Sequence, residues 1–264
     1  MFKLKEFKLE LPHTQIDCIA FGSGTRPLVM IQGLNTRGIK GAGASLAWMY
    51  RIFVKDYRVY FFDRRAEVSD GFSVRDMAAD VAAAMDKLQL RAADVLGVSQ
   101  GGMIAQHLAI ERPDLVRKLV LAVTLSRDND TVSRTVQHWI KLTEQNQMKE
   151  LISDMAIKMY SDAYLKRYRP FLPLLTVLQK PKDIPRFLIL AKACLGCKAH
   201  EELQKIQCPV LVIGGEKDQV VGADASREIA EQLGCRIHMY KDLGHAAYEE
   251  AKDFNQRVYD FLQE

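Results

Sequence analysis

The chain has 264 residues, of which 48% are hydrophobic and 27% are charged, and its formal net charge is +4. This composition is typical of one globular domain with a sizeable core, and it excludes a disordered or low-complexity chain. The net charge is small and the Lys and Arg residues are dispersed, so we expect no nucleic-acid partner.

No apolar run reaches membrane-spanning length, so we expect no association with a membrane. Residues 1–7 alternate apolar and charged side chains, unlike the uninterrupted apolar stretch of a signal peptide. The cysteines, at positions 18, 194, 197, 208 and 235, are odd in number and scattered, which does not fit the disulfide framework of a secreted protein. We therefore expect a cytoplasmic protein.

The predicted elements begin with two strands, Lys3–Leu9 and Gln15–Phe21, which add an antiparallel edge to a sheet. Short apolar runs then alternate with helical patterns, which predicts a mostly parallel sheet of eight strands. Several of these runs are apolar at nearly every position, as expected for strands covered by helices on both faces. The six runs are Leu28–Ile31, Arg58–Phe62, Val95–Val98, Leu119–Val123, Val210–Ile213 and Arg236–Tyr240.

Helical patterns lie between these strands. Ser73, with Asp76 three residues later, predicts the capped start of one helix. Three more helices are predicted over Gln100–Glu111, which Pro113 ends, over Ala223–Leu233 and over Tyr248–Leu262.

The alternation stops between residues 125 and 205, where roughly eighty residues carry helical patterns without a convincing strand. We expect a helical cap inserted there, and an α/β core made of residues 1–124 and 206–264. Proline ends or kinks a helix, so the prolines of this stretch divide the predicted cap into short helices. They are Pro170, Pro173, Pro181 and Pro185. A cap over the strand ends would close a pocket.

The most informative motif is Gly97-Val98-Ser99-Gln100-Gly101, which directly follows a predicted strand and begins a predicted helix. A serine at such a turn is the nucleophile of acyl-transfer chemistry. Side chains two residues before and after the serine would collide in so sharp a turn, and Gly97 and Gly101 remove those collisions. We therefore predict Ser99 as the nucleophile.

The base and the acid follow later predicted strands. His245 comes after the last strand and Asp218 after the strand Val210–Ile213. The carboxyl ends of parallel strands meet at one edge of a sheet, so both side chains are expected near Ser99. His245 would take the proton of Ser99, and Asp218 would orient the imidazole and stabilise its cation. The order serine, aspartate, histidine is that of α/β hydrolases.

Two other acids, Glu216 and Asp128, also lie near strand ends and are the alternatives for the third position. The remaining histidines lack this context, because His107 lies on a helix and His238 lies inside a strand. His13, His138 and His200 are expected to be solvated or structural.

An oxyanion hole needs two backbone donors, which we assign to the N–H groups of Gln100 and Leu34. Gly33 gives the loop after Leu28–Ile31 room to bend toward the site, and it also suits a plain tight turn.

These motifs resemble the α/β-hydrolase superfamily over nearly the whole chain, and within it the capped, single-domain, esterase-like branch. Val95–Ala105 resembles the family's nucleophile region, and Asp63-Arg64-Arg65 resembles the loop after its fourth strand. Cys208–Gly215 with Asp218, and Gly244-His245, resemble its acid and histidine segments. The family commonly has His-Gly after the third strand where this chain has Gln32-Gly33, which affects the side-chain part of the oxyanion loop and not its backbone donor.

The residues and the resemblance together predict a serine hydrolase, specifically a carboxylesterase. It would cleave a carboxylic ester, lactone or thioester of a small to medium, largely apolar substrate through an acyl-enzyme on Ser99. A serine nucleophile separates the chain from the dehalogenase and epoxide-hydrolase branches, and Gln100, where proline iminopeptidases carry Trp, disfavours that branch. A carbon-carbon bond hydrolase or lyase with the same triad is the alternative, and a non-catalytic ligand receptor is the alternative from another class.

No cofactor or metal ion is expected, the expected partner is a small-molecule substrate, and no motif defines an oligomeric state. Cys194, Cys197, His200 and Cys208 have zinc-ligand residue types, but they would have to converge across a helix and a strand. The basic residues of the predicted cap favour either an acidic substrate or a solvated face. They are Lys166, Arg167, Arg169, Lys180 and Lys182.

Overall fold

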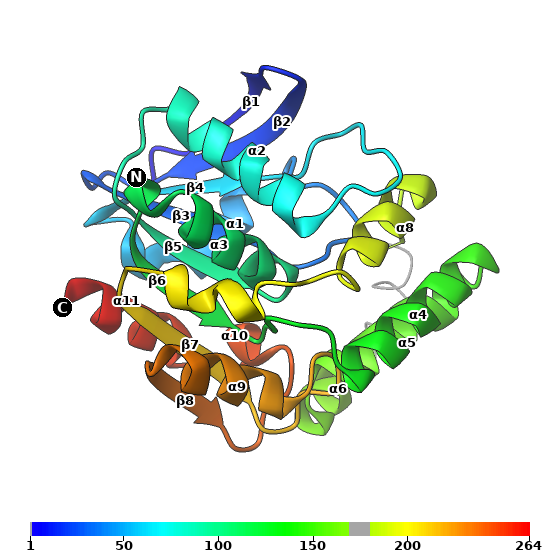
Figure 1. Ribbon diagram of the computed structural model, residues 1–264. Coiled ribbons are helices and arrows are strands. Elements are labelled where there is room, and N and C mark those ends of the chain that lie inside the picture. Colours follow the sequence, from blue (N-terminus) through cyan, green and yellow to red (C-terminus); the bar gives the residue numbers. More distant parts are fainter. Residues whose placement is uncertain (1, 169–179) are drawn as a thin grey trace.

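The computed structural model describes residues 2–168 and 180–264, and its centre is an eight-stranded sheet (Figure 1). Across the sheet the order is β1-β2-β4-β3-β5-β6-β7-β8, with β1 and β2 antiparallel to their neighbours and the other pairs parallel. The predicted sheet with its antiparallel edge is confirmed, and only the strand ends differ by a few residues. The strands are β1 (Lys5–Leu11), β2 (Thr14–Phe21), β3 (Arg26–Ile31), β4 (Tyr57–Phe62), β5 (Ala93–Val98), β6 (Val116–Ala122), β7 (Val210–Gly215) and β8 (Arg236–Tyr240).

Helices cover both faces of the sheet. The α3 face is covered by α2 (Val74–Lys87), α3 (Gln100–Glu111) and α9 (Ala223–Leu233), and the α11 face by α1 (Gly43–Met49), α10 (Ala247–Glu250) and α11 (Phe254–Gln263). Successive strand residues point to opposite faces. Thus Val29 and Ile31 join the apolar cluster of the α3 face, whereas Leu28 and Met30 join that of the α11 face. Short 3-10 helices lie at Arg51–Phe53, Pro113–Leu115 and His200–Lys205.

The predicted start of α2 is confirmed, because the Ser73 side chain accepts from the N–H of Asp76 and the Asp76 carboxylate accepts from the N–H of Ser73 at 2.8 Å. The prediction of one helix over Tyr248–Leu262 is wrong. The chain leaves the helical conformation at Ala251, so α10 and α11 are separate. This break lets Phe254 enter the core at 1% exposure, with its ring edge-on to Tyr248.

Residues 125–205, which we call the helical segment, lie between β6 and β7. Their described part contributes no strand to the sheet and pairs only in an isolated bridge between Arg127 and Lys198. Pro181 precedes α8 and Pro185 is its second residue, where a missing N–H is tolerated, so Pro185 begins a helix. Pro170 and Pro173 lie outside the described residues. The α-helices of its described part are α4 (Asp130–Glu144), α5 (Met148–Met159), α6 (Asp162–Tyr168) and α8 (Ile184–Ala193).

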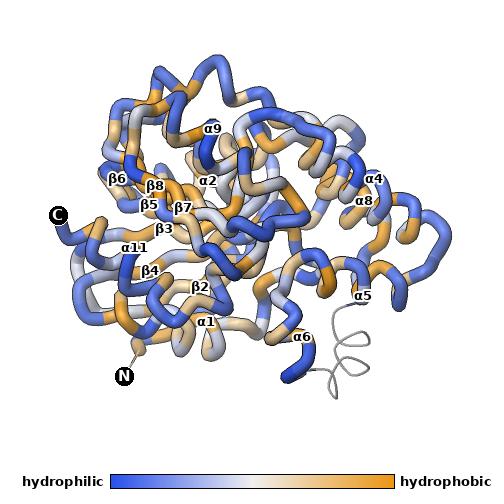
Figure 2. The backbone as a smooth tube through the Cα atoms, turned by 90° about the horizontal axis from the view of Figure 1, so that it is seen from below, coloured by the Kyte–Doolittle hydropathy of each residue, from blue (hydrophilic) through white to orange (hydrophobic). Residues whose placement is uncertain are grey.

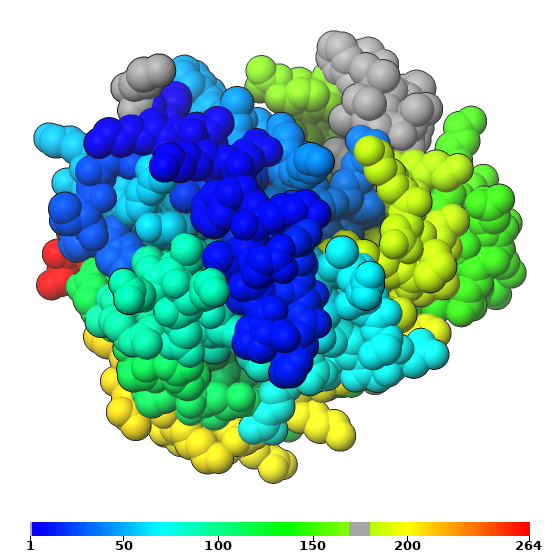
Figure 3. All heavy atoms as spheres, turned by 90° about the horizontal axis from the view of Figure 1, so that it is seen from above, coloured from blue at the N-terminus to red at the C-terminus, as the bar shows by residue number. Residues whose placement is uncertain are grey.

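Helices α4, α5, α6 and α8 of the helical segment lie to one side of the sheet (Figure 1), and the same side carries the yellow-green and green parts of the chain in Figure 3. Leu190 of α8 and Trp139 of α4 belong to the apolar cluster of the α3 face, so the core continues into this segment. Hydrophobic residues concentrate in the central strands, whereas α4 and α5 alternate between hydrophobic and hydrophilic stretches (Figure 2). In residues 2–168 and 180–264, no helix is long and apolar enough to cross a membrane.

Candidate active site

Ser99 occupies a strained turn between β5 and α3. Its φ of 55° and ψ of −122° lie in a region that a non-glycine residue rarely adopts. A Cβ at Gly97 would lie 2.5 Å from the carbonyl oxygen of Gly101, and a Cβ at Gly101 would lie 1.9 Å from that of Ile31. Only glycine fits at both positions, and the half-buried Ser99 is therefore presented at the carboxyl edge of the sheet.

The loops after β7 and β8 bring Asp218 and His245 to this edge. His245 Nε2 lies 2.9 Å from Ser99 Oγ, and His245 Nδ1 lies 2.8 Å from Asp218 Oδ2. The other oxygen of Asp218 accepts from the N–H groups of Val220 and Val221, which fixes the carboxylate. Asp218 and His245 are both buried. With Nδ1–H donated to Asp218, Nε2 is left to accept the hydroxyl proton of Ser99.

The competing acids lie elsewhere. Glu216 is ion-paired with Arg227 on the surface, and Asp128 is exposed at the start of the helical segment. Among the described residues, no histidine other than His245 hydrogen-bonds Ser99. The other five have surroundings of their own. His200 is hydrogen-bonded to Ser126, and His107 Nδ1 lies 4.0 Å from Glu111 Oε1. His138 lies near Asp154, His238 packs on Tyr240, and His13 is exposed.

The cysteines of the helical segment have separate partners. The Cys194 thiol lies 3.1 Å from Gln100 Nε2, and the Cys197 thiol lies 3.8 Å from the carbonyl oxygen of Leu125. Burial raises the pKa of both thiols to about 12, which disfavours the thiolate that zinc requires. With His200 bonded to Ser126, the structure does not bring the four zinc-type residues together.

The loop after β3 passes close to Ser99. A Cβ at Gly33 would lie 3.1 Å from Ser99 Cβ, a contact tighter than most, so glycine at this position suits the close approach of the loop to Ser99. Between described residues, no hydrogen bond occupies the N–H of Leu34 or of Gln100. Both predicted oxyanion donors are therefore free to bind a ligand.

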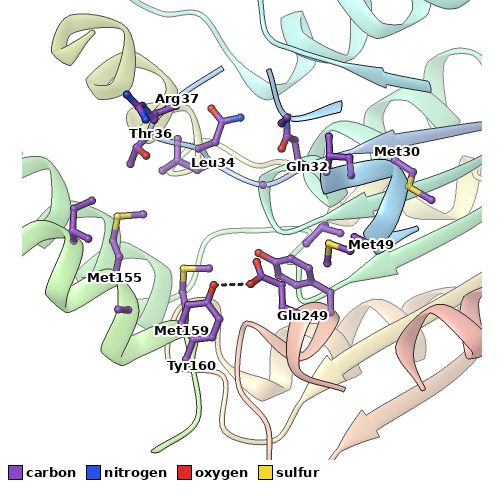
Figure 4. A pocket seen from close by; sticks show the side chains of 18 of the residues that line it. Met30, Gln32, Leu34, Thr36, Arg37, Met49, Met155, Met159, Tyr160 and Glu249 are labelled. Atoms are coloured by element: carbon purple, nitrogen blue, oxygen red, sulfur yellow. Dashed lines mark hydrogen bonds between the residues drawn. The ribbon is translucent and has the colours of Figure 1, made fainter. Parts of the chain in front are cut away.

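A cavity of about 900 Å³ begins at this loop and extends along the α11 face (Figure 4). Among the described residues, its charged lining consists of Arg37, Lys166 and Glu249, so Lys166 is the one described member of the predicted basic set that reaches the cavity. Arg169 lies outside the described residues. Most of the remaining lining is apolar, including Met30, Leu34, Met49, Tyr50, Phe61, Leu96, Val98, Ile152, Met155 and Met159.

The end of α5 is hydrogen-bonded to the chain that follows His245. The N–H of Ala246 donates to the carbonyl oxygen of Met159 at 2.8 Å, and the N–H of Ser161 donates to Glu250 at 2.9 Å. The hydroxyl of Tyr160 donates to Glu249 at 2.7 Å across the cavity wall (Figure 4). Burial, with Glu249 nearby, raises the pKa of Tyr160, so its hydroxyl stays neutral and donates. The ring of Tyr164 stacks on that of Tyr160, which lies between α5 and α6, and is tilted against that of Tyr168.

A family profile described as alpha/beta hydrolase fold matches residues 26–252. The chain belongs to the α/β-hydrolase fold family.

Among its relatives, a Rhizobium rhizogenes protein named "Putative carbamate hydrolase RutD" is 25% identical over 86% of this chain and 90% of its own length. A Pseudomonas sp. 2-hydroxy-6-oxononadienedioate/2-hydroxy-6-oxononatrienedioate hydrolase is 28% identical over 67% of this chain and 65% of its own. The solved enol-lactonase of Burkholderia xenovorans superposes with a TM-score of 0.85 at 21% identity, over 98% of this chain and 100% of that one. The family and the relatives' names support a hydrolase.

Sequence reasoning missed the strand residues that line the cavity and the environment of Arg64. Met30 and Leu96 share the period-2 pattern of the other buried strand residues, and nothing local distinguishes a cavity wall from a filled core. A charged residue at the carboxyl end of a buried strand was the available signal for Arg64.

Proposed function

We propose that the protein is a cofactor-independent serine hydrolase, a carboxylesterase that cleaves an ester, lactone or thioester of a small to medium, largely apolar substrate. The observation that carries this proposal is the hydrogen-bonded chain from Ser99 through His245 to Asp218. Its position beside a largely apolar cavity supports a substrate of that kind.

In the proposed reaction, His245 Nε2 takes the proton of Ser99 while Oγ attacks the carbonyl carbon. The oxyanion of the tetrahedral intermediate accepts from the N–H groups of Leu34 and Gln100. His245 then gives the proton to the leaving alcohol oxygen as the carbonyl–oxygen bond breaks, which leaves an acyl group on Ser99. Water, deprotonated by His245, attacks this ester, and the proton returns to Ser99 Oγ as the acid leaves.

We propose that the helical segment, residues 125–205, acts as a cap on the core formed by residues 1–124 and 206–264. Its α5 supplies one cavity wall, with Ile152, Met155 and Met159. A small-molecule substrate is the proposed partner. The cytoplasm is the proposed compartment, because all five cysteines are free thiols.

The alternative is hydrolysis of a carbon-carbon bond on the same residues, which the name of the Pseudomonas relative favours. In that reaction the carbonyl next to the bond that breaks would occupy the same two N–H groups.

The test is hydrolysis of p-nitrophenyl esters of increasing acyl length by the wild-type protein and by Ser99→Ala. We expect Ser99→Ala to lower kcat/KM by at least about 10⁴-fold, because triad members act as a unit. Equal rates in the two proteins would contradict the proposal. Failure of a fluorophosphonate to label Ser99 would then favour a receptor, and Ser99-dependent cleavage of a vinylogous diketone alone would favour carbon-carbon hydrolysis.

A further inference from the structure

Arg64, the second residue after β4, is a buried arginine at 6% exposure beneath the loop that follows β3. Its Nη2 lies 3.4 Å from the carbonyl oxygen of Gly33 and 3.2 Å from Gln100 Oε1, and it also donates to the carbonyl oxygen of Gln32. One guanidinium nitrogen therefore contacts the oxyanion loop and the first residue of α3 together.

The contact with Gly33 bears on Leu34. The carbonyl of Gly33 and the N–H of Leu34 belong to one planar trans peptide and point in opposite directions. Because Arg64 holds the carbonyl on its own side, the N–H of Leu34 is directed away from Arg64. The direction of this donor is thus set from behind the loop.

The contact with Gln100 reaches the second donor. The Oε1 of Gln100 accepts from Arg64, while its Nε2 donates to the carbonyl oxygen of Leu190 on α8 at 2.7 Å. The side chain is held at both ends, at 1% exposure, and its own backbone N–H is the other free donor beside Ser99. One cation is therefore bonded to the peptide of the first donor and to the side chain of the residue that carries the second.

This arrangement is costly for the fold. Among the described residues, the Nε and Nη1 atoms of Arg64 have no hydrogen-bond partner, and burial lowers the pKa of Arg64 to about 10. The adjacent Asp63 binds the backbone N–H groups of Arg64 and Ile39. A methionine would fill similar space without burying a charge. A buried charge with unpaired hydrogen-bond donors departs from the usual rules of core packing, and such departures are expected at functional sites.

We propose that Arg64 is a positioning residue that sets the placement of the Leu34 and Gln100 N–H groups relative to Ser99. It acts through these peptides, since it is not among the described residues that line the cavity. The inference rests on the proposed function, because the two donors matter for rate only if Ser99 is the nucleophile.

The experiment compares Arg64→Met and Arg64→Lys with Arg65→Met. Arg65 is the matched control, because its Nε donates to Asp80 on α2 at 2.7 Å and its side chain has no hydrogen bond to the oxyanion loop among the described residues. With active sites titrated by a fluorophosphonate, we expect Arg64→Met to lower kcat by about 10²-fold with KM within threefold, as for loss of one oxyanion donor. The kcat of Arg64→Lys should lie between those of Arg64→Met and the wild type, and the kcat of Arg65→Met should stay within threefold of the wild-type value.

A second readout separates positioning from folding. The inhibition constant of a boronic acid that forms a tetrahedral adduct on Ser99 should rise in Arg64→Met in proportion to the loss of kcat/KM. A lower Tm with kcat per titrated site unchanged would overturn the inference. If Arg64→Met does not fold, Gln100→Met tests the same link, with an expected loss of about tenfold.

A crystal structure of Arg64→Met distinguishes failure of this inference from failure of the proposed function. We expect a rotated Gly33–Leu34 peptide, and an unchanged peptide overturns the inference whatever reaction the protein performs. Equal activity of Ser99→Ala and wild type overturns the proposed function instead. In that case the orientation of the Gly33–Leu34 peptide in a crystal structure of Arg64→Met, or of Gln100→Met, still decides the role of Arg64.

Discussion

The two faces of the sheet differ most at the carboxyl ends of the strands. On the α3 face, Trp139, Leu151 and Leu190 of the helical segment join the same apolar cluster as the strands, so that side is filled. On the α11 face, Met30 and Leu96 border the cavity. The helical segment is thus packed onto one face and forms a cavity wall over the other. Residues of equal burial therefore differ in surroundings: those of the α3 face fill a core, whereas those of the α11 face border a cavity, where the proposed function gives them a part in substrate selection.

The largest effect on stability is expected on the α3 face. Met85 of α2 is fully buried in its cluster, and Met85→Ala should lower the free energy of unfolding by about 3 kcal/mol, because it leaves a closed void. Urea unfolding measures this loss. The ester-length preference should be unchanged, and a shifted preference would contradict the division between the faces.

The matched change on the other face is Met30→Ala. Met30 is 1% exposed, but it borders a cavity that already exists. Met30→Ala should therefore lower the free energy of unfolding by about half as much as Met85→Ala. The three side-chain atoms removed beyond Cβ should lengthen the preferred acyl chain by about two to three carbons. Rates on the p-nitrophenyl ester series measure this shift, and a cost equal to that of Met85→Ala with no shift would count against the comparison.

A smaller effect is expected within the helical segment. Asp154 of α5 accepts from Trp139 Nε1 and from Lys158 Nζ, both at 2.7 Å. Asp154→Ala leaves the buried indole N–H without this partner, so unfolding should become easier by about 1–2 kcal/mol. Lys158→Ala, the control, should cost less than about 1 kcal/mol. Equal losses in the two variants would show that the indole bond contributes little.

The smallest effect is a pH dependence on the α3 face. Burial lowers the pKa of His107, which faces Glu111, Arg75 and Glu202, and its Nδ1 has no hydrogen-bond partner among the described residues. Below about pH 6.5 the unfolded chain takes up a proton that the folded chain resists, so the free energy of unfolding should decrease as the pH falls. His107→Gln should flatten this decrease in urea titrations, and an unchanged slope would exclude His107 as its source.

Local patterns were sufficient for the strands and for Ser99, Asp218 and His245 as neighbours at the sheet edge. A strand, a sharp turn and a glycine pair each leave a signature within a few residues. The break between α10 and α11 at Ala251 and the cavity have no such local signature, because both depend on which distant side chains pack beside them. Arg64 shows this most clearly, since its partners lie 31 to 36 residues away along the chain.

The hydrogen bonds between the end of α5 and the chain after His245 have a consequence for protein engineering. Exchanging residues 125–205 for the corresponding part of another protein would also remove the carbonyl of Met159, which accepts from Ala246 beside the histidine. A graft that keeps Met159–Ser161 preserves this support, and one that replaces them alters the surroundings of His245 together with the cavity. Recombination within this fold is therefore constrained at the junction that follows α5.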